Sequence, residues 1–118
     1  MQDLEKLKKR SEFQRAYHKG KKYWNQYFVI YVLNTDFNLL RFGITVSKKV
    51  GKSVQRNRVK RLIRESFRQL RPKIKKGYDL VVVGRTPATQ LTAQEAHIAL
   101  ANLFQRAAIF KRRNQNRK

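Results

Sequence analysis

The run "YDLVVVG", residues 78–84, is the feature that most limits the possible fold. From Leu80 to Val83 every side chain is apolar, so a strand here has no face that suits water. Such a strand is typical of a sheet that is covered by other layers on both faces. The sequence therefore predicts that this strand lies at or near the centre of a sheet with helices packed on it.

Two earlier runs predict further strands. Residues 27–33, "YFVIYVL", and residues 39–46, "LLRFGITV", are rich in aromatic and β-branched residues, and the turn-like "NTDFN" lies between them. We expect an antiparallel hairpin with Leu33 opposite Leu39. This register sets three further pairs: Tyr31 with Arg41, Val29 with Gly43 and Tyr27 with Thr45.

The second of these runs alternates in character. One side of the strand consists of Leu40, Phe42, Ile44 and Val46, and the other consists of Arg41, Gly43 and Thr45. Because successive strand residues point to opposite faces, the sheet is predicted to have one dry face and one aromatic, partly polar face.

Helix signals lie before and between these strands. Ser11 and Gln14 have the spacing of a capping box at the start of a short helix, "EFQRAYHK", which Gly20 can end in a left-handed turn. The basic stretch after residue 52 predicts a second helix. It should end at about Leu70 or Arg71, because the residue before a proline avoids helical geometry.

A third helix is predicted near the end of the chain. Thr92 and Glu95 form a capping box, and an apolar repeat follows at helical spacing: Ala96, Leu100, Leu103, Phe104 and Ala107. The order of elements is therefore αββαβα, an α+β fold in a single domain of residues 1–110. The last residues, "KRRNQNRK", 111–118, are too polar to pack and are predicted to form a mobile basic tail.

Composition limits the partners of the chain. It has 118 residues, of which 41% are apolar, enough for one packed domain. Its 29 Lys and Arg against 7 Asp and Glu give a net charge of +22, which predicts binding to a polyanion, most simply nucleic acid. The absence of cysteine excludes disulfides and Cys-ligated zinc. No apolar run is long enough to span a bilayer or to form a signal peptide, so a cytoplasmic protein is expected.

The letters Gly51-Lys52-Ser53 match the end of a nucleotide-binding P-loop, but the rest of that motif is missing. A P-loop needs another glycine five residues earlier, where this chain has Val46. No plausible Walker-B acid follows a strand, because Asp79 lies near the start of the run at 78–84. We therefore interpret this stretch as the entry to the basic helix.

The basic helix has two faces of opposite character. Its core stripe consists of Val59, Leu62, Ile63, Phe67 and Leu70. The opposite face consists of Asn57, Lys60, Arg61, Arg64, Arg68 and Arg71, with Arg56 and Arg58 on its flanks and Glu65 as the one acid. Like charges four residues apart destabilise a helix, so the row of Lys60, Arg64 and Arg68 favours an anion-binding face over a merely solvated one.

At these residues the chain closely resembles the bacterial ribonuclease P protein subunit. The stretch "VSKKVGKSVQRNRVKRLIRESFR" places Arg56-Asn57-Arg58 at the start of a basic helix that follows a strand, which is a specific combination. The resemblance continues through "RSEFQRAYHKGKKY", "FVIYV", "YDLVVVGRTPA" and the closing helix, so it covers nearly the whole chain.

The resemblance implies an accessory protein that joins a catalytic RNA, one copy per RNA, to remove the 5′ leader from precursor tRNA. It implies that the RNA hydrolyses the phosphodiester with a divalent metal, Mg²⁺, and that the protein supplies no catalytic residue and no tightly bound metal. It also implies a left-handed crossover between the strands that flank the basic helix, against the right-handed rule for such units.

The resemblance further implies two binding surfaces. Contacts to the RNA subunit are expected from the basic helix and the lysines before it: Lys48, Lys49, Lys52, Arg56, Asn57, Arg58, Lys60, Arg61, Arg64 and Arg68. The single-stranded leader is expected in a cleft between the first helix and the sheet, lined by Phe13, Tyr17, Val29, Tyr31 and Thr45. Aromatic stacking beside positive charge suits a strand of unspecified sequence, although two aromatics one helical turn apart also suit a core.

Two other functions share some of these features. A ribosomal or architectural nucleic-acid-binding protein would have the same size and charge. A self-sufficient metal nuclease would need paired carboxylates on one catalytic face. The seven acids, Asp3, Glu5, Glu12, Asp36, Glu65, Asp79 and Glu95, show no pair at such a spacing. We interpret them as turn and capping residues.

Overall fold

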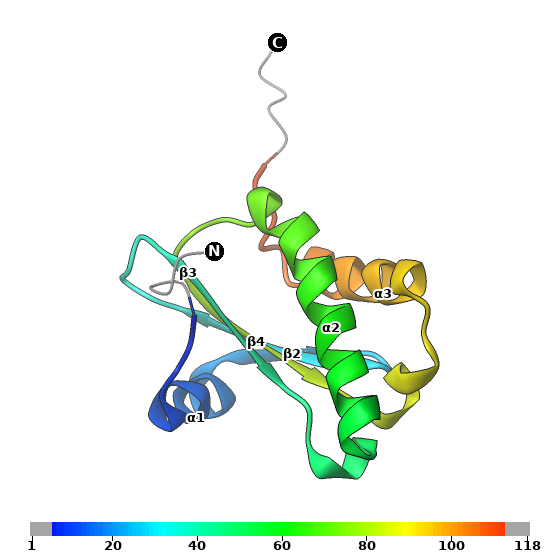
Figure 1. The fold of residues 1–118 in the computed structure, drawn as a ribbon. Coiled ribbons are helices and arrows are strands. Elements are labelled where there is room, and N and C mark those ends of the chain that lie inside the picture. Colours follow the sequence, from blue (N-terminus) through cyan, green and yellow to red (C-terminus); the bar gives the residue numbers. More distant parts are fainter. Residues whose placement is uncertain (1–5, 113–118) are drawn as a thin grey trace.

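The computed structural model describes residues 6–112, which contain three α-helices and four β-strands (Figure 1). In chain order these are α1 (Arg10–Lys19), β1 (Lys21–Trp24), β2 (Phe28–Asn34), β3 (Leu40–Thr45), α2 (Ser53–Leu70), β4 (Tyr78–Gly84) and α3 (Ala93–Arg106). Short 3₁₀ turns lie between them: η2 (Lys48–Val50), η3 (Arg71–Lys73) and η4 (Thr86–Gln90). The predicted α+β class is confirmed, whereas the predicted tail lies, from residue 113 on, outside the described residues.

The four described strands form one sheet in the order β1-β2-β4-β3. β4 lies between β2, its antiparallel partner, and β3, its parallel partner, which confirms the central place predicted for this strand. The predicted hairpin of β2 with β3 is wrong, together with its register, because β4 separates them. β4 is apolar on both faces, so a central position between two strands suits it best. β3 carries Arg41 and Thr45 on one face and can therefore lie at the edge of the sheet.

β1 has no counterpart among the predicted elements. Its four residues, "KKYW", are mostly exposed and show no apolar alternation. The strand pairs antiparallel to β2, with Lys21 opposite Val32 and Trp24 opposite Val29. Backbone pairing with β2, and not a hydrophobic pattern, defines it, so the order of elements is αβββαβα.

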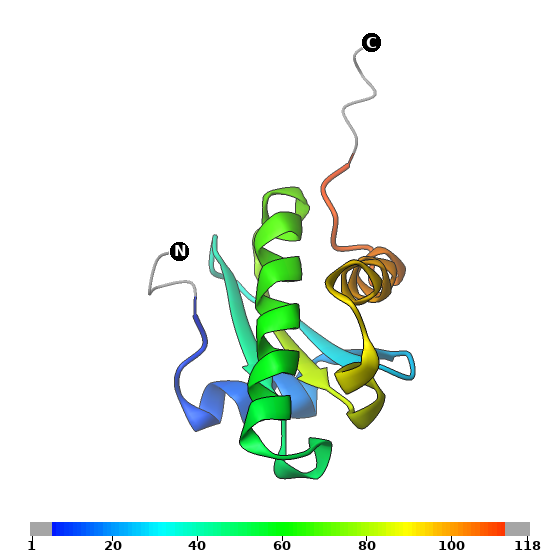
Figure 2. The same ribbon diagram turned by 45° about the vertical axis from the view of Figure 1, so that its right-hand side comes forward.

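Helices cover the two faces of the sheet unequally, as Figures 1 and 2 show. α2 and α3 lie on one face, where Ile30, Phe42 and Leu80 belong to the main core. α1 lies on the other face, where Leu7, Ala16 and Val81 form a smaller cluster. The predicted core stripe of α2 is buried throughout, and the alternation predicted for β3 is confirmed.

α1 begins differently from the prediction. Its first residue is Arg10, and the carboxylate of Glu12 accepts hydrogen bonds from the backbone N–H groups of Lys8 (2.8 Å) and Lys9 (2.9 Å). The predicted capping box at residues 11–14 is therefore wrong. A carboxylate accepts such hydrogen bonds more strongly than a neutral side chain and also suits the positive end of the helix dipole.

The other helix ends follow the sequence more closely. α2 ends at Leu70, just before Pro72, and the capping box of α3 is confirmed by hydrogen bonds between Thr92 and Glu95 in both directions (2.9 and 3.1 Å). Gly20 is not left-handed as predicted: its φ is −78°, because the chain continues at once into β1. α2 connects the parallel strands β3 and β4. The left-handed sense expected for this crossover connection stays a prediction.

Candidate nucleic-acid interface

The outer face of α2 carries most of the cations predicted to bind the RNA subunit. Arg61 and Arg64 are exposed and Lys60 is half-buried. Within residues 6–112 these three side chains form no ion pair, and Glu65, the acid on this helix, pairs with Arg68. Positive charge without compensation along one helix face attracts a phosphate backbone.

Three further lysines lie before the helix. Lys48 and Lys49 belong to η2, Lys52 precedes the first residue of α2, and all three are exposed. Gly51 has a φ of 152°, and a Cβ at this position would lie 2.1 Å from the side-chain oxygen of Gln55. The stretch that resembled a P-loop is thus a tight turn that places these lysines beside the positive end of the α2 dipole.

Two arginines of the Arg-Asn-Arg motif have intramolecular roles that the sequence did not indicate. The Arg58 guanidinium donates to the carbonyl oxygens of Thr89 (3.0 Å) and Leu91 (2.7 Å), and so ties α2 to the segment before α3. Arg56 donates to the carbonyl oxygen of Gly51 (3.2 Å). The predicted RNA contacts of both residues stay predictions, and Asn57 between them is exposed.

A groove of about 760 Å³ lies between α1 and the end of β3, and we call it the α1 groove. Three of the predicted leader residues line it: Phe13, Tyr17 and Thr45. The Tyr17 hydroxyl and the Thr45 hydroxyl are 2.7 Å apart, which joins the helix to the sheet. Phe13 packs so closely on the sheet that a Cβ at Gly43 would lie 2.6 Å from its ring.

The other two predicted leader residues lie behind this groove. Tyr31 contacts Tyr17 edge to face, with ring centroids 4.9 Å apart, and belongs to the small cluster under α1. Val29 is half-buried on the same face of β2 and is not among the residues that line the groove. Phe13 and Tyr17 are both half-buried, so each is partly core and partly available surface.

Several lysine, arginine and histidine residues at the α1 groove were not among the predicted leader contacts. Lys8, Arg10 and His18 line it from the side of α1, and Lys60 lines it from α2. Lys60 had been predicted only as a contact to the RNA subunit. The spatial approach of α2 to α1 across β3 brings it here, and no local sequence pattern indicates that approach.

A partly buried ion-pair network supports the position of α1. The Arg41 guanidinium donates to both carboxylate oxygens of Asp79, each at 2.7 Å, and to Glu12 at 3.1 Å. Asp79 is 1% exposed, so the interpretation of this acid as a turn residue is wrong. The hydrogen bonds with Asp79 raise the pKa of Arg41, and backbone N–H groups with Arg41 nearby lower the pKa of Glu12. The network joins α1, β3 and β4.

His, Asp and Glu side chains within residues 6–112 do not gather in groups of three or more that could hold a metal ion. The helices in the same range include none that is both long and apolar enough to cross a bilayer.

Comparison with known proteins gives consistent matches. A family model described as Ribonuclease P matches residues 1–108. The ribonuclease P protein component of Clostridium botulinum (strain Langeland) is 46% identical over 106 residues, which cover 89% of this chain and 96% of that protein. The solved structure of Staphylococcus aureus RNase P protein has a TM-score of 0.83 at 37% identity and covers 91% of this chain and 98% of that one. The solved structure of RNase P protein from Thermotoga maritima has a TM-score of 0.78 at 34% identity and covers 86% of this chain and 96% of that one. This chain belongs to the ribonuclease P protein family.

Proposed function

We propose that this chain is the accessory protein subunit of a ribonuclease P ribonucleoprotein and that it binds both a catalytic RNA and the 5′ leader of precursor tRNA. Membership of the family implies an endoribonuclease complex with an RNA partner. The observation that carries the finer proposal is the presence of two different surfaces, a cationic helix face and an aromatic groove, which meet at Lys60.

The outer face of α2 is the surface proposed for the RNA subunit. Lys60, Arg61 and Arg64 have no acidic partner within the described residues and can each neutralise a phosphate. Arginine also forms bidentate hydrogen bonds with phosphate, which orients the partner as well as attracting it. Because α2 is a single helix of 18 residues, its cations form a rigid row.

The α1 groove is the surface proposed for the leader. A single strand exposes the faces of its bases, and these stack on aromatic rings without regard to sequence. Phe13 and Tyr17 provide rings at the groove, while Lys8, Arg10 and Lys60 provide positive charge for the phosphates. A double helix does not expose its base faces in this way, so the groove favours the unpaired leader.

In this proposal the RNA subunit performs the hydrolysis with Mg²⁺, and the protein assists by holding RNA and substrate together. A ribosomal or architectural role would use the cationic face alone and would leave the aromatic groove unexplained. An intrinsic nuclease would cleave RNA without any RNA partner.

The experiment is reconstitution with a bacterial ribonuclease P RNA at low magnesium. We expect cleavage of precursor tRNA only when both RNA and protein are present, and tighter binding of precursor than of mature tRNA. Turnover by the purified protein alone would favour an intrinsic nuclease. Equal affinity for the two tRNAs in the assembled complex would contradict the proposed leader site.

A further inference from the structure

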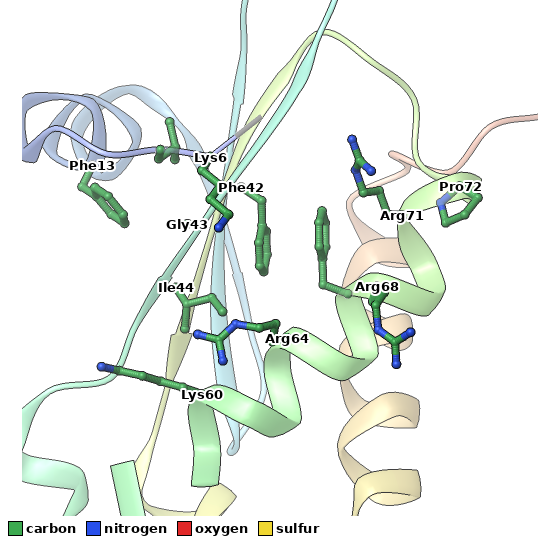
Figure 3. Close-up of a pocket in the computed structure, with 12 residues that line it drawn as sticks. Lys6, Phe13, Phe42, Gly43, Ile44, Lys60, Arg64, Arg68, Arg71 and Pro72 are labelled. Carbon is green, nitrogen blue, oxygen red and sulfur yellow. The ribbon is translucent and has the colours of Figure 1, made fainter. Parts of the chain in front are cut away.

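A second groove, of about 500 Å³, lies between the segment before α1, the edge strand β3 and the cationic face of α2 (Figure 3). We call it the β3–α2 groove. Its lining residues are Lys6, Leu7, Phe13, Phe42, Gly43, Ile44, Lys60, Arg64, Phe67, Arg68, Arg71 and Pro72. Neither predicted binding surface includes it as a site.

The inner surface of the β3–α2 groove is apolar and rigid. Phe42 of β3 and Phe67 of α2 stack in parallel with ring centroids 3.6 Å apart, and both are buried. Leu7, which belongs to the smaller cluster on the α1 face of the sheet, also lines the groove, and its backbone N–H donates a hydrogen bond of 3.0 Å to the carbonyl oxygen of Phe42. Figure 3 shows Ile44 between Phe42 and Lys60.

The rim of the groove is cationic. Lys6 and Arg64 are exposed, Lys60 is half-buried, and none of these three forms an ion pair within the described chain. None of the 12 lining residues is acidic. An apolar interior below unpaired cations is complementary to a ligand that is flat and apolar at one end and anionic at the other.

The two grooves are continuous. Phe13, Ile44 and Lys60 line both of them, so they meet between α1 and the middle of α2. A polymer that leaves the α1 groove past Phe13 therefore reaches the β3–α2 groove without crossing an acidic surface. This continuity selects a single strand over a small free anion as the occupant.

We propose that the β3–α2 groove holds an unstacked nucleobase of the same single strand that occupies the α1 groove, with the adjoining phosphates on Lys6 and Arg64. The proposal rests on the proposed function and extends the leader site past Phe13. A base in a double helix has both faces stacked on its neighbours, so the apolar interior selects unpaired RNA.

The test uses the reconstituted complex and precursor tRNAs whose leaders increase from two nucleotides upward. With the unaltered protein, the affinity of the complex for precursor tRNA should increase as the leader fills the α1 groove. It should increase a second time when the leader is long enough to reach the β3–α2 groove. Lys6→Ala, a residue outside the surface proposed for the RNA subunit, should remove this later gain, about fivefold for one lost phosphate contact, and leave the affinity for short-leader substrates unchanged. Lys21→Ala is the matched control, because Lys21 is an exposed lysine of β1, at the opposite edge of the sheet. An equal loss at every leader length, or no loss at any, would overturn the proposal.

A second arm needs no RNA subunit, so it still decides the question if reconstitution fails. The full chain is cross-linked to oligonucleotides that carry one 4-thiouridine at successive positions, and the attached peptides are mapped by mass spectrometry. We expect an end position of a hexamer to cross-link to the segments around Lys6 and Phe42, and a dinucleotide to cross-link only to α1 and Thr45. Hexamer cross-links that map only to α1 and Thr45 would refute the second groove as a binding site.

Discussion

Replacing Arg41 with Met should lower the free energy of unfolding by about 3–5 kcal/mol, because it leaves a buried carboxylate without its partner. Asp79 is 1% exposed, and both of its carboxylate oxygens accept hydrogen bonds of 2.7 Å from this one guanidinium. Met fills much of the same volume, so the change removes the charge and the hydrogen bonds more than the packing.

Almost all of this loss in the free energy of unfolding is expected to come from Asp79. Glu12 is more exposed, at 24% for its side chain, and keeps its hydrogen bonds from two backbone N–H groups, so its share should stay below about 1 kcal/mol. For a domain of this size the total corresponds to a fall in melting temperature of about 10–20 °C. The same substitution at Arg15, an exposed residue of α1, should cost little.

The assay is thermal and urea unfolding followed by circular dichroism, in sulfate so that every variant starts folded. The double variant Arg41→Met with Asp79→Leu should recover most of the loss, because no fully buried carboxylate is left without a partner. A loss below about 1 kcal/mol for Arg41→Met would refute the assignment of this network to stability. If the double variant were as unstable as the single one, lost packing and not the unpaired charge would be the cause.

Reversing the charge at Arg61 or Arg64 should weaken assembly with the RNA subunit and reduce the log–log salt slope by about one for each lost phosphate contact, measured by filter binding at several salt concentrations. Replacing Tyr17 with Ala should spare assembly but weaken binding of precursor tRNA by about 1–3 kcal/mol for one lost stacking partner, and an equal loss for mature tRNA would contradict the leader site. Sulfate or polyphosphate should increase the folded fraction of the free protein, because its net charge of +22 opposes compact structure, and a circular-dichroism titration without anion dependence would count against this. Glu12 has a pKa below its ordinary value of 4.5, so its stabilising contribution should be complete above that pH and decline as the pH falls through the lowered pKa; melting curves of Glu12→Gln and the unaltered protein should therefore converge in acid.

The elements that the sequence predicted well are those with a strong local pattern. The helix at Ser53–Leu70 has an apolar stripe and a proline at its end, and the strand at Tyr78–Gly84 is apolar on both faces. The pairing of strands was predicted wrongly because a turn between two runs suggests a hairpin even when a later strand enters between them. β1 was missed because its pairing with β2 holds it in place without any apolar alternation.

For the candidate site, too, the sequence predicted some features and not others. Which residues carry charge or aromatic rings can be read from the sequence, and the face on which each strand residue lies follows from alternation. The sequence does not indicate which cations already bind other groups of the protein. Arg58 donates hydrogen bonds to two carbonyl oxygens more than 30 residues away, and Arg41 forms an ion pair with the buried Asp79. These contacts depend on the order β2-β4-β3, which brings together segments distant in the chain.

Lys60 connects the two proposed binding surfaces within one rigid element. It belongs to the cationic face of α2, and its side chain also lines both the α1 groove and the β3–α2 groove. The core stripe on the opposite side of α2 packs on the sheet that carries Thr45, so helix and groove cannot move independently without breaking the main core. A strand held in the grooves is therefore held at a fixed position relative to any RNA bound along α2. In the proposed function, such fixed positioning is the contribution that this protein would make to cleavage by the RNA subunit.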